Sequence, residues 1–157
     1  MKKNLNTQNN KAGIWIDHEH AYIFQLNKDY LYEMKTVYSR IAEKEDIQEG
    51  KKISRFRRLF INYARKQRRQ HQYMLKFYEA IIQHLISCNH IYLFGPGNTK
   101  YELYNCIIKT QKKTGLRVLA IDAVDKIPPT QILEQVKNYF KSLRFEDSIR
   151  QLEHTTD

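Results

Sequence analysis

One segment in the middle of the chain constrains the fold more than any other. Between Phe56 and Leu85, mostly apolar side chains recur at spacings of three and four residues. These spacings bring side chains to one face of an α-helix, which turns once about every 3.6 residues. The sequence therefore predicts one long helix with a single stripe along it: Phe56, Phe60, Tyr63, Gln67, Gln70, Met74, Phe77, Ile81 and Leu85.

The same segment carries the whole excess of positive charge. The chain has 27 basic and 17 acidic residues, and ten of the basic ones fall between positions 51 and 76, where there is no acid. Without these ten, basic and acidic residues are equal in number. Charge focused in this way makes a local field that attracts polyanions. The ten residues are Lys51, Lys52, Arg55, Arg57, Arg58, Arg65, Lys66, Arg68, Arg69 and Lys76.

Strands are predicted on both sides of this helix. Apolar runs and alternating patterns indicate strands at residues 12–17, 20–26, 30–39, 90–94 and 116–121. The first three are close enough in the chain to form an antiparallel meander, and the later ones follow helical crossovers. The order βββαβαβα predicts an α/β fold with a mixed five-stranded sheet, which is the layout of the ribonuclease H-like fold.

Two shorter helices complete the expected order. Asn98 or Thr99 can cap a helix that runs to about Gln111. Pro128-Pro129-Thr130 opens the last helix, which runs to about Lys141. The side chains expected to face the core are Leu103, Ile107 and Ile108 in the first of these helices, and Ile132, Leu133, Val136 and Phe140 in the last.

Length and composition exclude several classes of protein. A chain of 157 residues is expected to form one domain, here at 12–143, with a disordered arm at 1–11 and a C-terminal tail at 144–157. No apolar run reaches the roughly 18 residues of a membrane span, and the first residues lack the apolar core of a signal peptide. Cys88 and Cys106 are predicted to be buried thiols of a reducing compartment. We therefore expect a cytoplasmic protein without membrane contact.

Catalytic patterns are incomplete. Asp17 closes the first strand as a two-metal nuclease would require, but the fourth strand offers no second acid. His18-Glu19-His20 has metal-capable side chains, although a hairpin turn explains them without a metal. Cys88 with His84 or His90 can imitate a nucleophile and its base, but core packing explains these positions better. The sequence thus predicts no enzyme, no catalytic residue, no metal, no cofactor and no small-molecule substrate.

A glycine-rich turn links the fourth strand to the next helix. It does not have the spacing of a phosphate-binding P-loop. The helix that follows can still accept one phosphate at its N-terminus, while glycine dihedrals in a tight turn are the simpler explanation. The residues of this candidate phosphate-contacting turn are Gly95, Gly97, Asn98, Thr99 and Lys100.

The basic helix is the strongest functional signal. A merely solvated helix face is expected to contain acids that pair with the basic residues, and this segment contains none. Polyanion binding therefore explains the segment better. Tyr63, His71 and Tyr73 lie among the basic residues and can stack on bases, although Tyr63 also fits the apolar stripe. RNA is the expected polyanion. DNA stays an alternative, although the sequence shows no helix-turn-helix, zinc finger or dimer zipper.

Three motifs resemble the central domain of archaeal and eukaryotic class-1 peptide release factors and of Pelota-type rescue factors. They are the strand Gly13-Ile14-Trp15-Ile16-Asp17-His18, the turn and helix start Phe94–Leu103, and Val124-Asp125-Lys126 before the last helix. The likeness is greatest to short bacterial proteins built on that domain. It implies a ribonuclease H-like fold that enters the ribosomal A site and reaches the peptidyl transferase centre.

The chain departs from that family at its hydrolytic motif. The resemblance places the family's Gly-Gly-Gln loop at residues 48–55, and no Gly-Gly pair occurs anywhere in the chain. The basic start of the family's long helix does carry over, onto Arg55, Arg57 and Arg58. The codon-reading and partner-recruiting domains of the family have no counterpart here.

These observations together predict a non-catalytic ribosome-associated factor. It would bind the rRNA of the large subunit near the A site and peptidyl transferase region, with tRNA as a further partner, during hibernation, stress or rescue. Two alternatives stay open. One is a peptidyl-tRNA hydrolase or release factor that uses a group other than Gly-Gly-Gln, and the other is a general RNA-binding adaptor.

Overall fold

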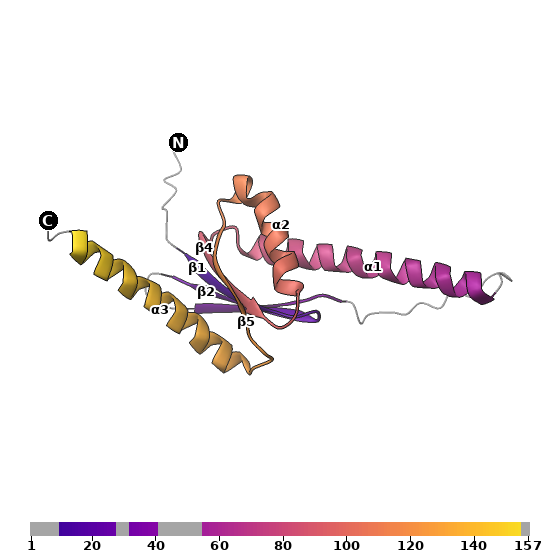
Figure 1. The fold of residues 1–157 in the computed structure, drawn as a ribbon, viewed down its shortest axis with the longest axis horizontal. Coiled ribbons are helices and arrows are strands. Elements are labelled where there is room, and N and C mark those ends of the chain that lie inside the picture. The colour runs from indigo at the N-terminus through magenta and orange to yellow at the C-terminus, as the bar shows by residue number, and fades with distance from the viewer. Residues whose placement is uncertain (1–9, 28–31, 41–54, 155–157) are drawn as a thin grey trace.

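The structure, a computed structural model, describes residues 10–27, 32–40 and 55–154. Within the last range, the side chains at positions 55, 56, 58 and 60 lie outside the description. Eight elements follow one another in the predicted order (Figure 1). They are β1 (Lys11–Ile16), β2 (His20–Leu26), β3 (Tyr32–Tyr38), α1 (Arg55–His84), β4 (His90–Gly95), α2 (Thr99–Thr114), β5 (Arg117–Ala123) and α3 (Pro129–His154).

The five strands form one mixed sheet in the order β3-β2-β1-β4-β5. β1, β2 and β3 are antiparallel neighbours, as the short connections between them require. β4 and β5 run parallel to β1, and each is reached through a helical crossover. The predicted α/β fold with a mixed five-stranded sheet is confirmed, while its assignment to the ribonuclease H-like fold stays a prediction.

Helices cover the two faces of the sheet unequally. On one face, α1 and α2 bury a core that includes Ile14, Ile23 and Leu93. On the other face, α3 alone packs over a core that includes Trp15 and Phe94. The two faces of β1 and β4 are therefore both buried, which explains why these strands read as continuous apolar runs rather than as alternating ones.

The approach of α3 to the sheet depends on Gly13 in β1. A Cβ atom at this position would lie 2.1 Å from Cγ2 of Val136, so α3 contacts the strand where the strand has no side chain. The inward residues predicted for α3 are confirmed, because Ile132, Val136 and Phe140 are fully buried and Leu133 packs against them. The prediction that Ile108 of α2 faces the core is wrong. Its side chain is 45% exposed, since the apolar face of α2 is narrower than its sequence suggests.

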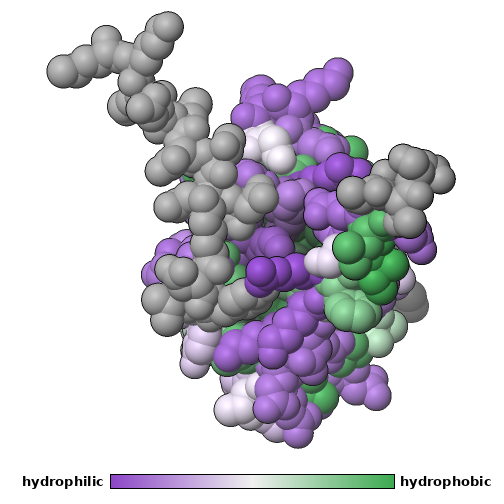
Figure 2. Space-filling view, turned by 90° about the vertical axis from the view of Figure 1, so that its left-hand side faces the viewer, coloured by the Kyte–Doolittle hydropathy of each residue, from purple (hydrophilic) through white to green (hydrophobic). Residues whose placement is uncertain are grey.

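The C-terminal end of α3 extends past the sheet. The helix continues to His154, so the predicted end near Lys141 and the predicted tail from residue 144 onward are wrong. Phe145, Ile149 and Leu152 are exposed on this extension. Figure 2, which views the molecule from the side where α3 ends, shows an apolar patch there on an otherwise mostly hydrophilic surface. None of the helices in the described part of the chain combines the length and apolar character of a membrane span.

Candidate nucleic-acid interface

Helix α1 consists of a packed half and a projecting half. From Met74 onward most of its apolar side chains are buried, among them Phe77 and Ile81, although Leu75 is 39% exposed. Before Met74 no side chain with a described position is buried, and the helix extends far beyond the sheet (Figure 1). At a rise of about 1.5 Å per residue, the segment from Arg55 to Tyr73 is roughly 28 Å long. From here on, "the arm" means this projecting segment of α1, residues 55–73, and not the N-terminal residues 1–11.

The predicted stripe of α1 is not buried along its whole length, because its first half belongs to the arm. Tyr63, expected along the same packed face as Ile81, is 62% exposed, and Leu59 is 66% exposed. The helical period of the stripe is right, but the sheet does not reach beneath its first half. Gln67 and Gln70 occupy stripe positions and are exposed, so the loss of apolar character at these positions was a signal of the boundary.

The described basic residues of the predicted site are all exposed. Those whose side chains the structure places are Arg57, Arg65, Lys66, Arg68, Arg69 and Lys76. Arg55 and Arg58 belong to α1, but their side chains lie outside the described residues, as do Lys51 and Lys52 entirely. At about 100° per residue, the six described positions fall within one half of the helix circumference, opposite the line of Tyr63 and Met74. They form one basic face.

The arginines of this basic face have no acidic neighbour on the projecting part of α1. The first acid of α1 is Glu79, in the packed half, and no ion pair involves Arg65, Arg68 or Arg69 among the residues that the structure describes. Arg65 lies three and four residues before the other two, a spacing at which like charges on a helix repel. The first turn also lacks an acid, although the positive end of the helix dipole favours one. A bound polyanion would supply the negative charge that the projecting part of α1 and its first turn lack. It would also reduce the repulsion between the arginines.

Aromatic side chains also project from the arm, and Tyr63 does so on the side opposite the basic face. The exposed Tyr63 accepts a hydrogen bond at its hydroxyl from Gln67 Nε2, at 2.7 Å, which holds the ring along the arm. His71 is exposed and Tyr73 is half-buried. Since none of the three belongs to the buried core, all are placed where a nucleobase can reach them.

The glycine-rich turn is occupied largely by its own contacts. Lys100 is only 2% exposed, and its Nζ donates to the carbonyl oxygen of Gly97 at 2.5 Å. Thr99 is fully buried, with its hydroxyl 3.1 Å from His18 Nδ1. Only Gly97 and Asn98 of the predicted phosphate-contacting turn are exposed. The structure therefore brings the five residues together but directs the lysine inward.

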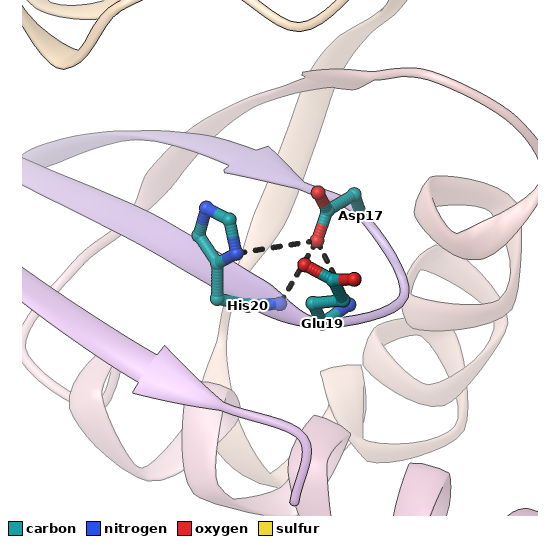
Figure 3. Close-up of side chains that lie close together, drawn as sticks. All are labelled: Asp17, Glu19 and His20. Carbon is teal, nitrogen blue, oxygen red and sulfur yellow. Dashed lines mark hydrogen bonds and ion pairs between the residues drawn. The ribbon is translucent and has the colours of Figure 1, made fainter. Parts of the chain in front are cut away.

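The β1–β2 turn gathers Asp17, Glu19 and His20 (Figure 3). Asp17 Oδ1 accepts backbone hydrogen bonds from Glu19 and His20, at 2.8 and 2.9 Å, and lies 3.5 Å from His20 Nδ1. Their potential ligand atoms lie within 4.8 Å of one another, while His18 contacts Thr99 instead. Closing the hairpin explains Asp17, since aspartate side chains commonly bond to backbone N–H groups two residues on.

The cysteines have the character of structural thiols. Cys88 is 1% exposed, and burial raises its pKa to about 11, with smaller opposite effects from Ser87 and Lys35. Cys106 is half-buried, and burial raises its pKa also. Both thiols are therefore protonated at neutral pH and are poor nucleophiles. The prediction of buried thiols is confirmed for Cys88 and only partly for Cys106.

Comparison with known proteins finds similarity in structure alone. No protein-family model matches the sequence, and no curated protein matches it. Among solved structures, the Pelota protein of Thermoplasma acidophilum is 16% identical, with a TM-score of 0.43 over 75% of this chain and 30% of that one. Dom34 of S. cerevisiae, a translation termination-like factor involved in RNA quality control pathways, is 12% identical, with a TM-score of 0.42 over 99% and 44%.

The archaeal translation termination factor aRF1 is 11% identical, with a TM-score of 0.39 over 93% of this chain and 43% of that one. These are proteins of the kind that the sequence motifs resemble. The chain spans less than half the length of each of the three.

Proposed function

We propose that this protein is a non-catalytic, cytoplasmic, ribosome-associated factor that binds ribosomal RNA through the basic face of the arm. The observation that carries the proposal is the arm itself. Five described basic side chains lie on one half of this projecting segment, Lys76 continues the same face into the packed half, and α1 has no acid before Glu79. Among the described residues the arm packs against no other element. A helix without such packing is marginal in water, and repulsion between its own charges weakens it further. Contact with phosphates would offset both effects.

The ribosome is favoured over other RNA by the motifs that resemble release factors and Pelota-type factors. These factors place their long basic helix in the large subunit, and we propose the same orientation for the arm, near the A site and peptidyl transferase region. The proposed role is occupation of that site during hibernation, stress or rescue. Arginine suits such a site because its guanidinium binds phosphate oxygens in a bidentate manner.

Binding to ribosomes is expected to depend steeply on salt. If about five basic side chains contact phosphates, the logarithm of the association constant should fall against the logarithm of salt concentration with a slope of roughly −3 to −5. Pelleting with purified ribosomes across a salt series measures this slope. Free tRNA and bulk RNA are the competitors, and equal competition by bulk RNA would contradict ribosome specificity. A slope near zero would contradict the electrostatic basis of binding.

The protein is expected not to hydrolyse peptidyl-tRNA. Attack on the ester needs a positioned water and support for the oxyanion, and the sequence lacks the Gly-Gly pair of the family's hydrolytic loop. Ribosomes that carry a labelled nascent chain, incubated with a stoichiometric amount of protein, should release no more label than a buffer control does. Release above that background would establish the hydrolase alternative.

A further inference from the structure

Strand β3 forms one edge of the sheet in the described part of the chain. Its seven residues pair with β2 in unbroken register, and no other strand of the described chain pairs with its outer side. An edge strand offers a row of unpaired N–H and C=O groups, which proteins commonly protect with proline, a bulge or a short length. Between Tyr32 and Tyr38 there is no proline and no irregularity in register.

One face of β3 is apolar and exposed. Tyr32, Met34 and Tyr38 share this face by the alternation of a strand, and they are 50%, 47% and 68% exposed. It is the face that α3 covers further along the sheet. The Tyr32 ring approaches Phe24 of the core beneath α3 at 6.2 Å between centroids, and Lys137 of α3 lies over the same ring at 5.0 Å. The helix thus reaches the start of β3 and leaves Met34 and Tyr38 accessible.

The opposite face of β3 carries one acid and one base. Glu33 and Lys35 form an ion pair, with 3.4 Å between Glu33 Oε1 and Lys35 Nζ, and their side chains are 66% and 35% exposed. This pair makes the edge complementary to itself in one antiparallel register. With Met34 opposite Met34 of the partner subunit, Glu33 faces Lys35 of the partner subunit, and Lys35 faces the partner's Glu33.

We propose that a second copy of this chain pairs antiparallel with β3 in that register, which joins two sheets into one. The neighbouring registers are disfavoured because they place Glu33 opposite Glu33 of the partner subunit, or Lys35 opposite Lys35 of the partner subunit. The pairing keeps α1 and α2 of both copies on one side, and on the other side it places the exposed Met34 against Met34 of the partner subunit. In this register five residues of β3, 32–36, pair with the same five residues of the second copy. Such a ladder is short for a stable interface, so the dimer forms reversibly with rising concentration.

The test uses the full chain in sedimentation equilibrium over a wide concentration range. Wild type is expected to change from monomer to dimer, with a dissociation constant on the order of micromolar. Glu33→Lys and Lys35→Glu are each expected to raise that constant roughly tenfold, because each turns two attractive cross-strand pairs into repulsive ones. The double variant Glu33→Lys/Lys35→Glu restores complementarity and should dimerise like wild type.

Two further measurements keep the result specific. An equimolar mixture of the Glu33→Lys and Lys35→Glu chains is expected to form a mixed dimer, since all their cross-strand pairs are attractive. Lys109→Glu on α2, which changes the net charge as Lys35→Glu does, should leave association unchanged, and melting curves show whether each variant is folded. A wild type that stays monomeric throughout, single variants that dimerise like wild type, or association that requires added RNA or peptide would each overturn the proposal.

Discussion

Replacing Arg65 and Arg69 by glutamate is expected to weaken ribosome binding roughly 100-fold at moderate salt, because two charge-assisted phosphate contacts become repulsive. Both side chains are exposed on the basic face, so the substitution removes no packing. The salt dependence should become shallower by about two units of slope, one for each lost phosphate contact. Ribosome pelleting at several salt concentrations measures both effects together.

The chain offers a matched control for this variant. Lys109 and Lys113 are exposed on α2 with the same spacing of four residues, so Lys109→Glu/Lys113→Glu makes the same change in net charge away from the arm. If binding depends on the arm and not on total charge, the control should bind close to wild type. Equal weakening by both pairs would mean that the net charge alone attracts RNA.

The start of α1 is expected to matter more than its middle. In the orientation that we propose from the family resemblance, this end of α1 enters the ribosome. Phosphate contacts there are desolvated and less screened by salt. Arg55→Glu/Arg58→Glu should therefore abolish binding, with little loss of stability by circular dichroism and melting. A variant at these two positions that pellets like wild type would show that the orientation of the arm is wrong.

The sequence predicts the elements well because their signals are local. The period of the stripe in α1 and the N-cap position of Asn98 depend only on nearby residues, and both helices begin close to their expected positions. The Asn98 side chain itself makes no capping hydrogen bond. Where α1 leaves the core is not local, because it depends on how far the sheet extends beneath the helix. Thus Tyr63 and Ile81 share a stripe in the sequence, but only Ile81 has a strand to pack against.

The C-terminal extension of α3 has a helical signal in the sequence. Phe145, Ile149 and Leu152 recur at helical spacing, so the helix continues even though the extension meets no strand. In the candidate site, the residue types identified the basic face, and the fold was needed to show that it projects. The inward direction of the Lys100 side chain had no sequence signal, because only the folded turn brings its Nζ to the carbonyl of Gly97.

Gly95→Ala is expected to lower the free energy of unfolding by about 3 kcal/mol or more. Gly95 has a φ of +147°, a conformation that side chains rarely adopt, and a Cβ there would lie 2.2 Å from the carbonyl oxygen of Ile16. That oxygen belongs to β1, the middle strand of the sheet, so it cannot move aside without disturbing the pairing of β1 with its neighbours. Urea unfolding followed by circular dichroism measures the loss.

Gly97→Ala is the matched comparison in the same turn. Gly97 also has a positive φ, of +60°, but a Cβ there would meet nothing within 4 Å, so only the left-handed backbone opposes the change, at about 1 kcal/mol. Equal losses for the two variants would show that dihedral strain, and not the contact with β1, makes Gly95 necessary. Because Gly97→Ala is expected to stay folded, it also tests the phosphate-contacting turn. An added methyl on this exposed glycine would hinder a phosphate that approaches the backbone, so lower ribosome affinity would support that contact, and unchanged affinity would leave the turn a purely structural one.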